Sequence, residues 1–160
     1  MIEKKENVCL LDSSTTHSIL KDKNYFFIMT LRKANVHIIS GLVEMINGSG
    51  NATIMLPIGT TLHIEDALLS TKTKRNLLSF KDVRHNGYHL ETINENDIDY
   101  LCIISYKMDI KTNHGKIKAS ISGLYCVPIR TIESYVNISW KLKPTMERLK
   151  LQFRDCTVSP

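Results

Sequence analysis

The chain has 160 residues, a length typical of one domain with a single hydrophobic core. Hydrophobic residues make up 42% and charged residues 23%, a balance that excludes wholesale disorder. No apolar stretch approaches the ~20 residues that a membrane-spanning helix needs, so we expect no membrane partner. The net charge of +5 keeps nucleic acid open as a partner.

The cysteines and histidines do not form a recognisable metal motif. Three of the four cysteines, Cys9, Cys102 and Cys126, sit inside apolar runs, and none belongs to a Cys-x-x-Cys pair. We therefore expect buried free thiols in a reducing compartment, with no metal and no cofactor. The polar segment Met1–Glu6 is not followed by the apolar core of a signal peptide, so a cytoplasmic location is expected.

Apolar runs broken about every 8–12 residues by Gly, Asn, Asp or Pro predict an all-β fold of antiparallel strands, either a sandwich or a barrel. The Gly-rich segment 47–50 is interpreted as a turn, and Pro57–Thr60 as a hairpin turn in which the β-branched Ile58 would resist a positive φ. The predicted strands are Val8–Leu11, Leu42–Ile46, Thr53–Leu56, Leu62–Ile64, Tyr88–Ile93, Tyr100–Tyr106, Ile117–Ile121 and Leu124–Ile129.

Two helical patterns interrupt or follow the strands. Leu77, Phe80 and Arg84 lie at helical spacing and predict one short helix. After Pro144, an amphipathic pattern predicts either a helix or a disordered tail. The resulting domain organisation is an N-terminal tail (1–7), a β-domain (8–129) and a C-terminal tail (130–160).

The most informative local feature is the segment from Cys9 to Thr15, where an apolar strand ends in Asp12 and small hydroxyl residues follow. An aspartic protease half-site requires this pattern, because the strand holds the carboxylate and small residues let a partner carboxylate approach. Two such carboxylates share a proton, so that one activates water as a base while the other acts as an acid. Since the chain has one such motif, a complete site requires a two-fold homodimer. An ordinary strand-end turn is the alternative interpretation of Asp12.

The order of motifs resembles the protease-like region of copia-type LTR retrotransposon Pol polyproteins. The similarity runs from about Val8 to Tyr125, and no single element of it is specific. The matching segments are an apolar-Asp-Ser opening with a following His, a Gly-x-Gly segment, a strand, a Leu-Leu-Ser block, a Gly-Tyr strand and a Gly-Leu-Tyr end: Leu10–His17, Asn47–Ala52, Leu62–Leu68, Asn76–Phe80, Gly87–Leu90 and Gly123–Tyr125.

The resemblance implies a retropepsin-like β-barrel and an aspartic endopeptidase that processes its own polyprotein in cytoplasmic particles. Asp12 would be the catalytic carboxylate and Ser13 would support it. Ser14 stands where the family motif has Gly, and an added side chain at a dimer axis typically costs ~1–3 kcal/mol. Beyond Tyr125 the resemblance fades, so we expect a truncated and impaired copy. His17 fits the opening motif, with a structural hydrogen-bonding role expected.

Two other functions remain open. The first is a non-enzymatic β-barrel remnant, which Ser14 and the absent downstream motif favour. The second is a basic nucleic-acid-binding module, although the chain has few aromatic residues for stacking on bases. Some of the basic residues form two local clusters: Lys72, Lys74, Arg75, Lys81 and Arg84, and Lys141, Lys143, Arg148, Lys150 and Arg154.

Overall fold

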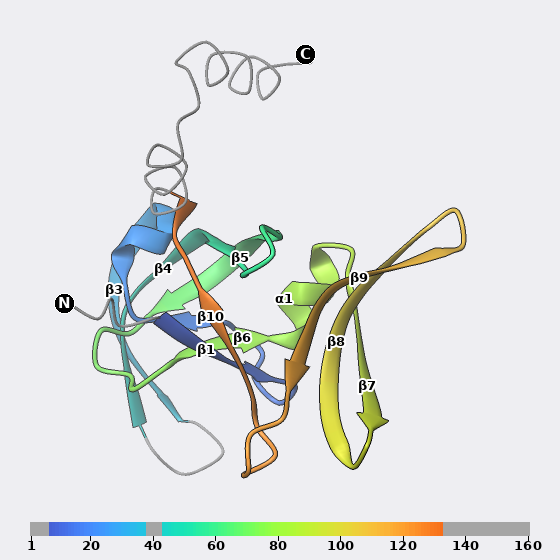
Figure 1. Cartoon of the computed structure of the whole chain (residues 1–160). Coiled ribbons are helices and arrows are strands. Elements are labelled where there is room, and N and C mark those ends of the chain that lie inside the picture. The colour runs from blue at the N-terminus through green and yellow to red at the C-terminus, as the bar shows by residue number, and fades with distance from the viewer. Residues whose placement is uncertain (1–6, 38–42, 133–160) are drawn as a thin grey trace, which may run out of the picture.

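A computed structural model describes residues 7–37 and 43–132, and it is mostly β-structure with one short α-helix (Figure 1). None of the helices in these two segments is both long and apolar enough to cross a membrane. The elements are β1 (Asn7–Asp12), β2 (Ile19–Leu20), the 3-10 helix η1 (Lys23–Tyr25), β3 (Phe26–His37), β4 (Val43–Met55), β5 (Thr61–Leu69), β6 (Asn76–Ser79), α1 (Phe80–His85), β7 (His89–Glu95), β8 (Ile98–Lys107), β9 (Ile110–Lys118) and β10 (Tyr125–Ile129).

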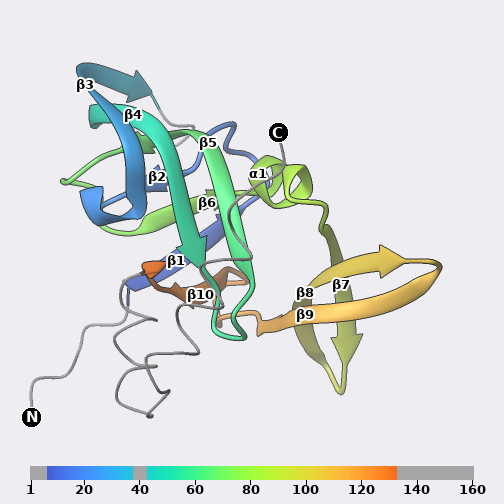
Figure 2. The ribbon, with the colours of Figure 1, turned by 90° about the horizontal axis from the view of Figure 1, so that it is seen from above.

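The strands form two sheets, which lie side by side in Figures 1 and 2. The larger sheet has seven strands in the order β10-β1-β6-β2-β5-β4-β3, and the smaller has three in the order β7-β8-β9. The predicted β class is confirmed, but the larger sheet is mixed rather than purely antiparallel, because β1 runs parallel to β6 and β2 parallel to β5. Alternating hydrophobicity identifies a strand without fixing its direction, which explains the error.

The larger sheet does not close into a barrel within the described residues. Its end strands are β10 and β3, and a single bridge curls the sheet toward closure. There the N–H of Met55 at the end of β4 donates to the carbonyl of Arg130 (2.9 Å), and the N–H of Arg130 donates to the carbonyl of Met55 (3.0 Å). The architecture is therefore a strongly curled open sheet with the smaller sheet beside it.

One continuous hydrophobic core joins both sheets and the helix. Burying apolar side chains between these elements supplies most of the stabilisation of such a fold. Along β1 the side chains alternate, so that Cys9 and Leu11 are buried while Leu10 and Asp12 are half-buried. The fully buried large side chains come from all parts of the domain: Leu20, Ile54, Leu62, Ile64, Leu78, Val83, Leu101, Ile103 and Ile129.

The predicted turn at residues 47–50 is wrong, because this segment lies inside β4. Gly48, Ser49 and Gly50 pair with both β3 and β5. The hairpin turn at Pro57–Thr60 is confirmed: the N–H of Gly59 donates to the carbonyl of Leu56 at 3.0 Å. Gly59 has φ +84, so glycine adopts the left-handed conformation in this turn, and Ile58 does not need a positive φ.

Other sequence predictions shift by a few residues or lie outside the described part. The short helix exists, but it begins at Phe80 because Ser79 is its N-cap, and Leu77 belongs to β6. The strand predicted over Ile117–Ile121 ends at Lys118. Cys9 and Cys102 are buried free thiols and Cys126 is half-buried. The predicted helix after Pro144 falls in residues 133–160, which lie outside the described residues.

Buried Tyr25 predicts a loss of stability at alkaline pH. Its side chain is 2% exposed, and burial, followed by the nearby charge of Asp22, raises its pKa from 10.0 to about 12. Tyrosinate therefore forms first in the unfolded chain, so this stabilisation is complete below pH 10 and is lost as the pH rises toward 12. We expect the free energy of unfolding to fall by about 1 kcal/mol by pH 11 through Tyr25. Burial also raises the pKa of Cys9, which adds a loss of the same sign.

Urea unfolding at pH 8 and pH 11 measures this loss. The Tyr25→Phe variant should lose less stability between the two pH values than the wild type. Tyr106→Phe is the matched control, because Tyr106 is 54% exposed. This substitution should leave the pH dependence of the free energy of unfolding as it is in the wild type. An identical loss in wild type and Tyr25→Phe would contradict the assignment to Tyr25.

Candidate active site

Asp12 is the last residue of β1, a strand held on both sides within the larger sheet (Figure 1). On one side β1 pairs with β10, and on the other it runs parallel to β6, where Asp12 lies opposite Ser79. The strand ends here because the next residues, Ser13 and Ser14, are exposed and form a bend. A central strand thus delivers a half-buried carboxylate to the start of an exposed loop.

The hydrogen bonds to Asp12 come from Ser14. The backbone N–H of Ser14 donates to Asp12 Oδ1 at 2.8 Å, and its hydroxyl donates to the same oxygen at 2.7 Å. This is a local turn in which the carboxylate binds the chain two residues on. Among the described residues, no group donates a hydrogen bond to Asp12 Oδ2, and Ser13 donates none to either oxygen of Asp12. The support expected of Ser13 is therefore supplied by Ser14.

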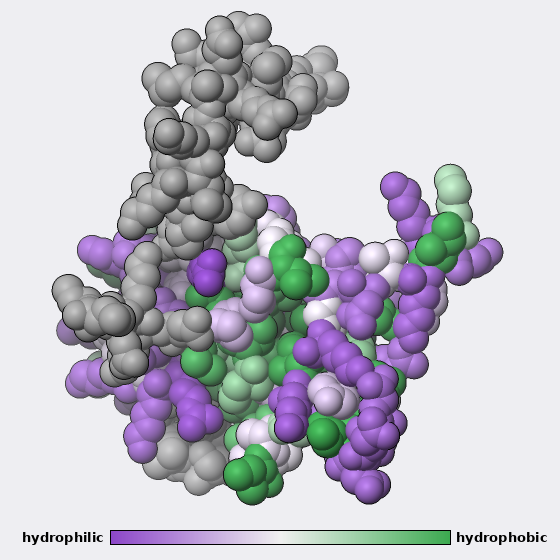
Figure 3. Space-filling view, viewed as in Figure 1, coloured by the Kyte–Doolittle hydropathy of each residue, from purple (hydrophilic) through white to green (hydrophobic). Residues whose placement is uncertain are grey.

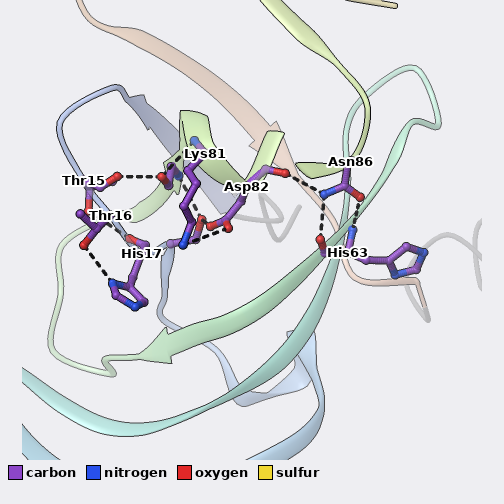
Figure 4. A network of polar contacts seen from close by, with 9 residues as sticks. Thr15, Thr16, His17, His63, Lys81, Asp82 and Asn86 are labelled. Atoms are coloured by element: carbon purple, nitrogen blue, oxygen red, sulfur yellow. Dashed lines mark hydrogen bonds and ion pairs between the residues drawn. The ribbon is translucent and has the colours of Figure 1, made fainter. Parts of the chain in front are cut away.

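A buried polar network fixes the loop that follows Asp12. Ser18 Oγ donates to Asp82 Oδ2 at 2.5 Å, and it accepts the backbone N–H of Ser79 at 3.0 Å. Ser79 Oγ in turn donates to the carbonyl of Thr15 at 2.7 Å (Figure 4). Both ends of the loop are thereby tied to the start of α1, which limits the positions that Asp12 can take.

Asn86 connects the other end of α1 to β5. Its Oδ1 accepts the N–H of His63 at 2.8 Å, and its Nδ2 donates to the carbonyl of His63 at 2.7 Å (Figure 4). The same Nδ2 donates to the carbonyl of Asp82 at 2.8 Å. The Asn-Gly pair at 86–87 predicts a turn, but it does not predict that the Asn86 side chain pairs with the backbone of His63 in β5. The helix is thus held by side-chain hydrogen bonds at both ends.

Ser18, Ser79 and Asp82, which support the loop, were not predicted from the sequence. A signal exists for two of them, because Ser79 followed three residues later by Asp82 is the pattern of a helix N-cap with an acidic first turn. Ser18 carries no comparable local signal, since its partners lie 61 and 64 residues away in the chain.

His17 lies in the same loop and does not contact the carboxylate of Asp12. Its Nδ1 is 2.9 Å from Thr16 Oγ1, and both residues are exposed (Figure 4). No three His, Cys, Asp or Glu side chains in the described part of the chain gather as metal ligands. The loop therefore offers one carboxylate, with one oxygen engaged by Ser14 and the other available.

The face of the sheet beside Asp12 is apolar and incompletely covered. Side chains that alternate with the buried Cys9 and Leu11 share a face with Asp12, and cross-strand partners share that face too. In Figure 3, apolar surface runs along the middle of the molecule, where β1 and β10 lie. The exposed or half-buried apolar residues of this face are Val8, Leu10, Leu77, Cys126 and Pro128, whereas Ser79, opposite Asp12, is buried.

Comparison with known proteins adds no assignment: the chain matches no family model, no curated protein and no solved structure.

Proposed function

We propose that this chain is the protease-like domain of a copia-type retrotransposon polyprotein, with Asp12 as one half of an aspartic endopeptidase site. The observation that carries the proposal is the position of Asp12, half-buried at the end of β1, which pairs with a strand on each side, and beside an exposed loop. A carboxylate in this position can meet its equivalent in a second copy, whereas one beneath other elements could not. The resemblance of the motifs in their order along the chain supports the same function.

The apolar face next to Asp12 provides a surface for the second copy. Val8 is 40% exposed, and Leu10 and Leu77 are half-buried beside it. Removing such apolar surface from water favours association. A two-fold axis near the end of β1 places two copies of Asp12 together, where one carboxylate acts as base on water and the other as acid on the peptide.

Ser14 impairs this site in two ways. Its Oγ donates a hydrogen bond to Asp12 Oδ1 at 2.7 Å. This hydroxyl therefore competes for a carboxylate oxygen that could otherwise hold the proton shared by the two carboxylates. Its side chain also adds volume near the axis, once from each copy, and overpacking costs ~1–3 kcal/mol. The proposed enzyme is consequently weak, and Ser14→Gly restores the motif of the family.

Ser14→Gly is expected to raise peptide cleavage at least about tenfold, the factor that corresponds to about 1.4 kcal/mol. The substrate is a set of peptides spanning candidate polyprotein junctions, and mass spectrometry detects the products across mildly acidic to neutral pH. The matched control is Ser14→Gly combined with Asp12→Asn, which keeps the loop and removes the acid–base group. Cleavage should vanish in this control.

Two results would overturn the proposal. One is the same cleavage by Ser14→Gly with and without Asp12→Asn, since the carboxylate would then be irrelevant. The other is a strictly monomeric Ser14→Gly chain in sedimentation at micromolar concentration together with no cleavage, because one copy supplies one carboxylate. A non-enzymatic β-domain would then be the better description.

A further inference from the structure

Five exposed cations converge at the end of the larger sheet remote from Asp12. Two of them come from the segment between β2 and η1, including the first residue of η1, and three from the loop that connects β5 to β6. We call them the basic patch: Lys21, Lys23, Lys72, Lys74 and Arg75. The basic patch and Asp12 lie at opposite ends of β6, because this strand begins at Asn76, beside the patch, and ends at Ser79, beside Asp12.

One backbone hydrogen bond and two between backbone and side chain hold the two segments against each other. The N–H of Lys21 donates to Asn76 Oδ1 at 2.9 Å, and Lys21 Nζ donates to the carbonyl of Lys74 at 3.3 Å. The N–H of Ser70 donates to the carbonyl of Leu20 at 2.9 Å. The patch is thus a fixed arrangement, so binding an anion requires little further ordering of the backbone.

The cations of the basic patch are not neutralised by neighbouring carboxylates. The ion pairs within the described segments involve Lys81, Lys111 and Lys116, none of which belongs to the patch. Asp22 lies between Lys21 and Lys23, but its carboxylate accepts the N–H of Asn24 at 2.8 Å as the cap of η1. Five cations against one capping carboxylate create a local positive potential that favours a polyanion.

We propose that the basic patch binds the phosphate backbone of single-stranded nucleic acid. Flexible lysines and one arginine suit repeated contacts with phosphates along a chain. Neither loop carries an exposed large apolar side chain, which an amphipathic membrane-binding surface would add. The patch offers no exposed aromatic ring for stacking on bases, so the binding is insensitive to sequence. The site is independent of Asp12 and of the proposed proteolysis.

The sequence grouped these residues differently. It placed Lys72, Lys74 and Arg75 with Lys81 and Arg84, but the latter two lie on α1 beyond the other end of β6. Lys21 and Lys23 join the patch only because β2 and β6 pair antiparallel, with Ile19 opposite Leu77. The convergence is a consequence of topology.

Fluorescence anisotropy of a labelled single-stranded RNA of about 20 nucleotides tests the proposal with the full chain. The variant Lys72→Glu/Lys74→Glu/Arg75→Glu should bind at least tenfold more weakly. Its slope of log K against log salt, measured from about 50 to about 200 mM, should be shallower by about 2. These side chains are exposed, and circular dichroism verifies that the variant is folded.

The matched control is Arg84→Glu/Lys107→Glu/Lys118→Glu, which makes the same change in net charge at exposed residues outside the patch. It should retain at least half of the wild-type affinity. An equal loss in both triple variants would overturn the proposal, because binding would then follow net charge alone. Binding to vesicles that contain phosphatidylserine, with none to RNA, would also overturn it and assign a membrane surface instead.

Discussion

Gly50→Ala is expected to destabilise the protein by at least about 3 kcal/mol, at or above the upper end of ordinary overpacking. A Cβ on Gly50 would overlap the carbonyl oxygen of Ile28 and lie 2.7 Å from Cα of Met29. These are backbone atoms of β3, the strand paired with β4, so rotating a side chain cannot relieve the contact. The strands must separate, which breaks hydrogen bonds on both sides of a register shift between Phe26 and Ile28.

Urea unfolding followed by circular dichroism measures this loss against a matched glycine. Gly115 lies in β9, and a Cβ there would meet only Ile103 Cδ1, at an ordinary 3.9 Å. Gly115→Ala should therefore leave the unfolding midpoint within experimental error or raise it slightly. If Gly50→Ala and Gly115→Ala had the same midpoint, the close approach of β3 and β4 would be refuted.

The same glycine shows why part of the fold was not predictable from the sequence. In Asn47–Gly50 two glycines near an asparagine indicate a turn, because glycine allows positive φ. The structure uses Gly50 for the absence of a side chain, and this depends on Ile28 and Met29, which lie more than 20 residues earlier in the chain. At Pro57–Thr60 the prediction succeeded because the hydrogen bonds of that turn are local.

The candidate site divides in the same way. The placement of Asp12 at a strand end follows from the apolar run before it and the hydroxyl residues after it, both of which are local. The neighbour of Asp12 across the sheet, Ser79, follows from a parallel pairing of β1 with β6 that no local pattern specifies. The hydrogen bonds that Ser14 makes to Asp12 are local, and they match the strand-end turn that the sequence offered as the alternative interpretation of Asp12.

Ser18→Ala is expected to destabilise the protein by about 3 kcal/mol, because it leaves two buried groups without their partner. Asp82 is 3% exposed and Ser79 is fully buried. Without the hydroxyl, the Asp82 carboxylate keeps, among the described residues, only the Lys81 ammonium, 3.9 Å from Oδ1, and the N–H of Ser79 loses its acceptor. Folding therefore has to desolvate a donor without an acceptor and a carboxylate that is compensated only by this long ion pair.

A double-mutant cycle separates this orphaned pair from a simple loss of packing. Asp82→Ala removes the carboxylate, so the combination Ser18→Ala/Asp82→Ala should cost about 1 kcal/mol or more less than the sum of the single changes. Ser122→Ala is the control, because the Ser122 hydroxyl lies 3.0 Å from Ser120 Oγ on the surface and should contribute less than about 0.5 kcal/mol. Additive effects of Ser18→Ala and Asp82→Ala would show that the two side chains act independently, and the loop after Asp12 would then need another anchor.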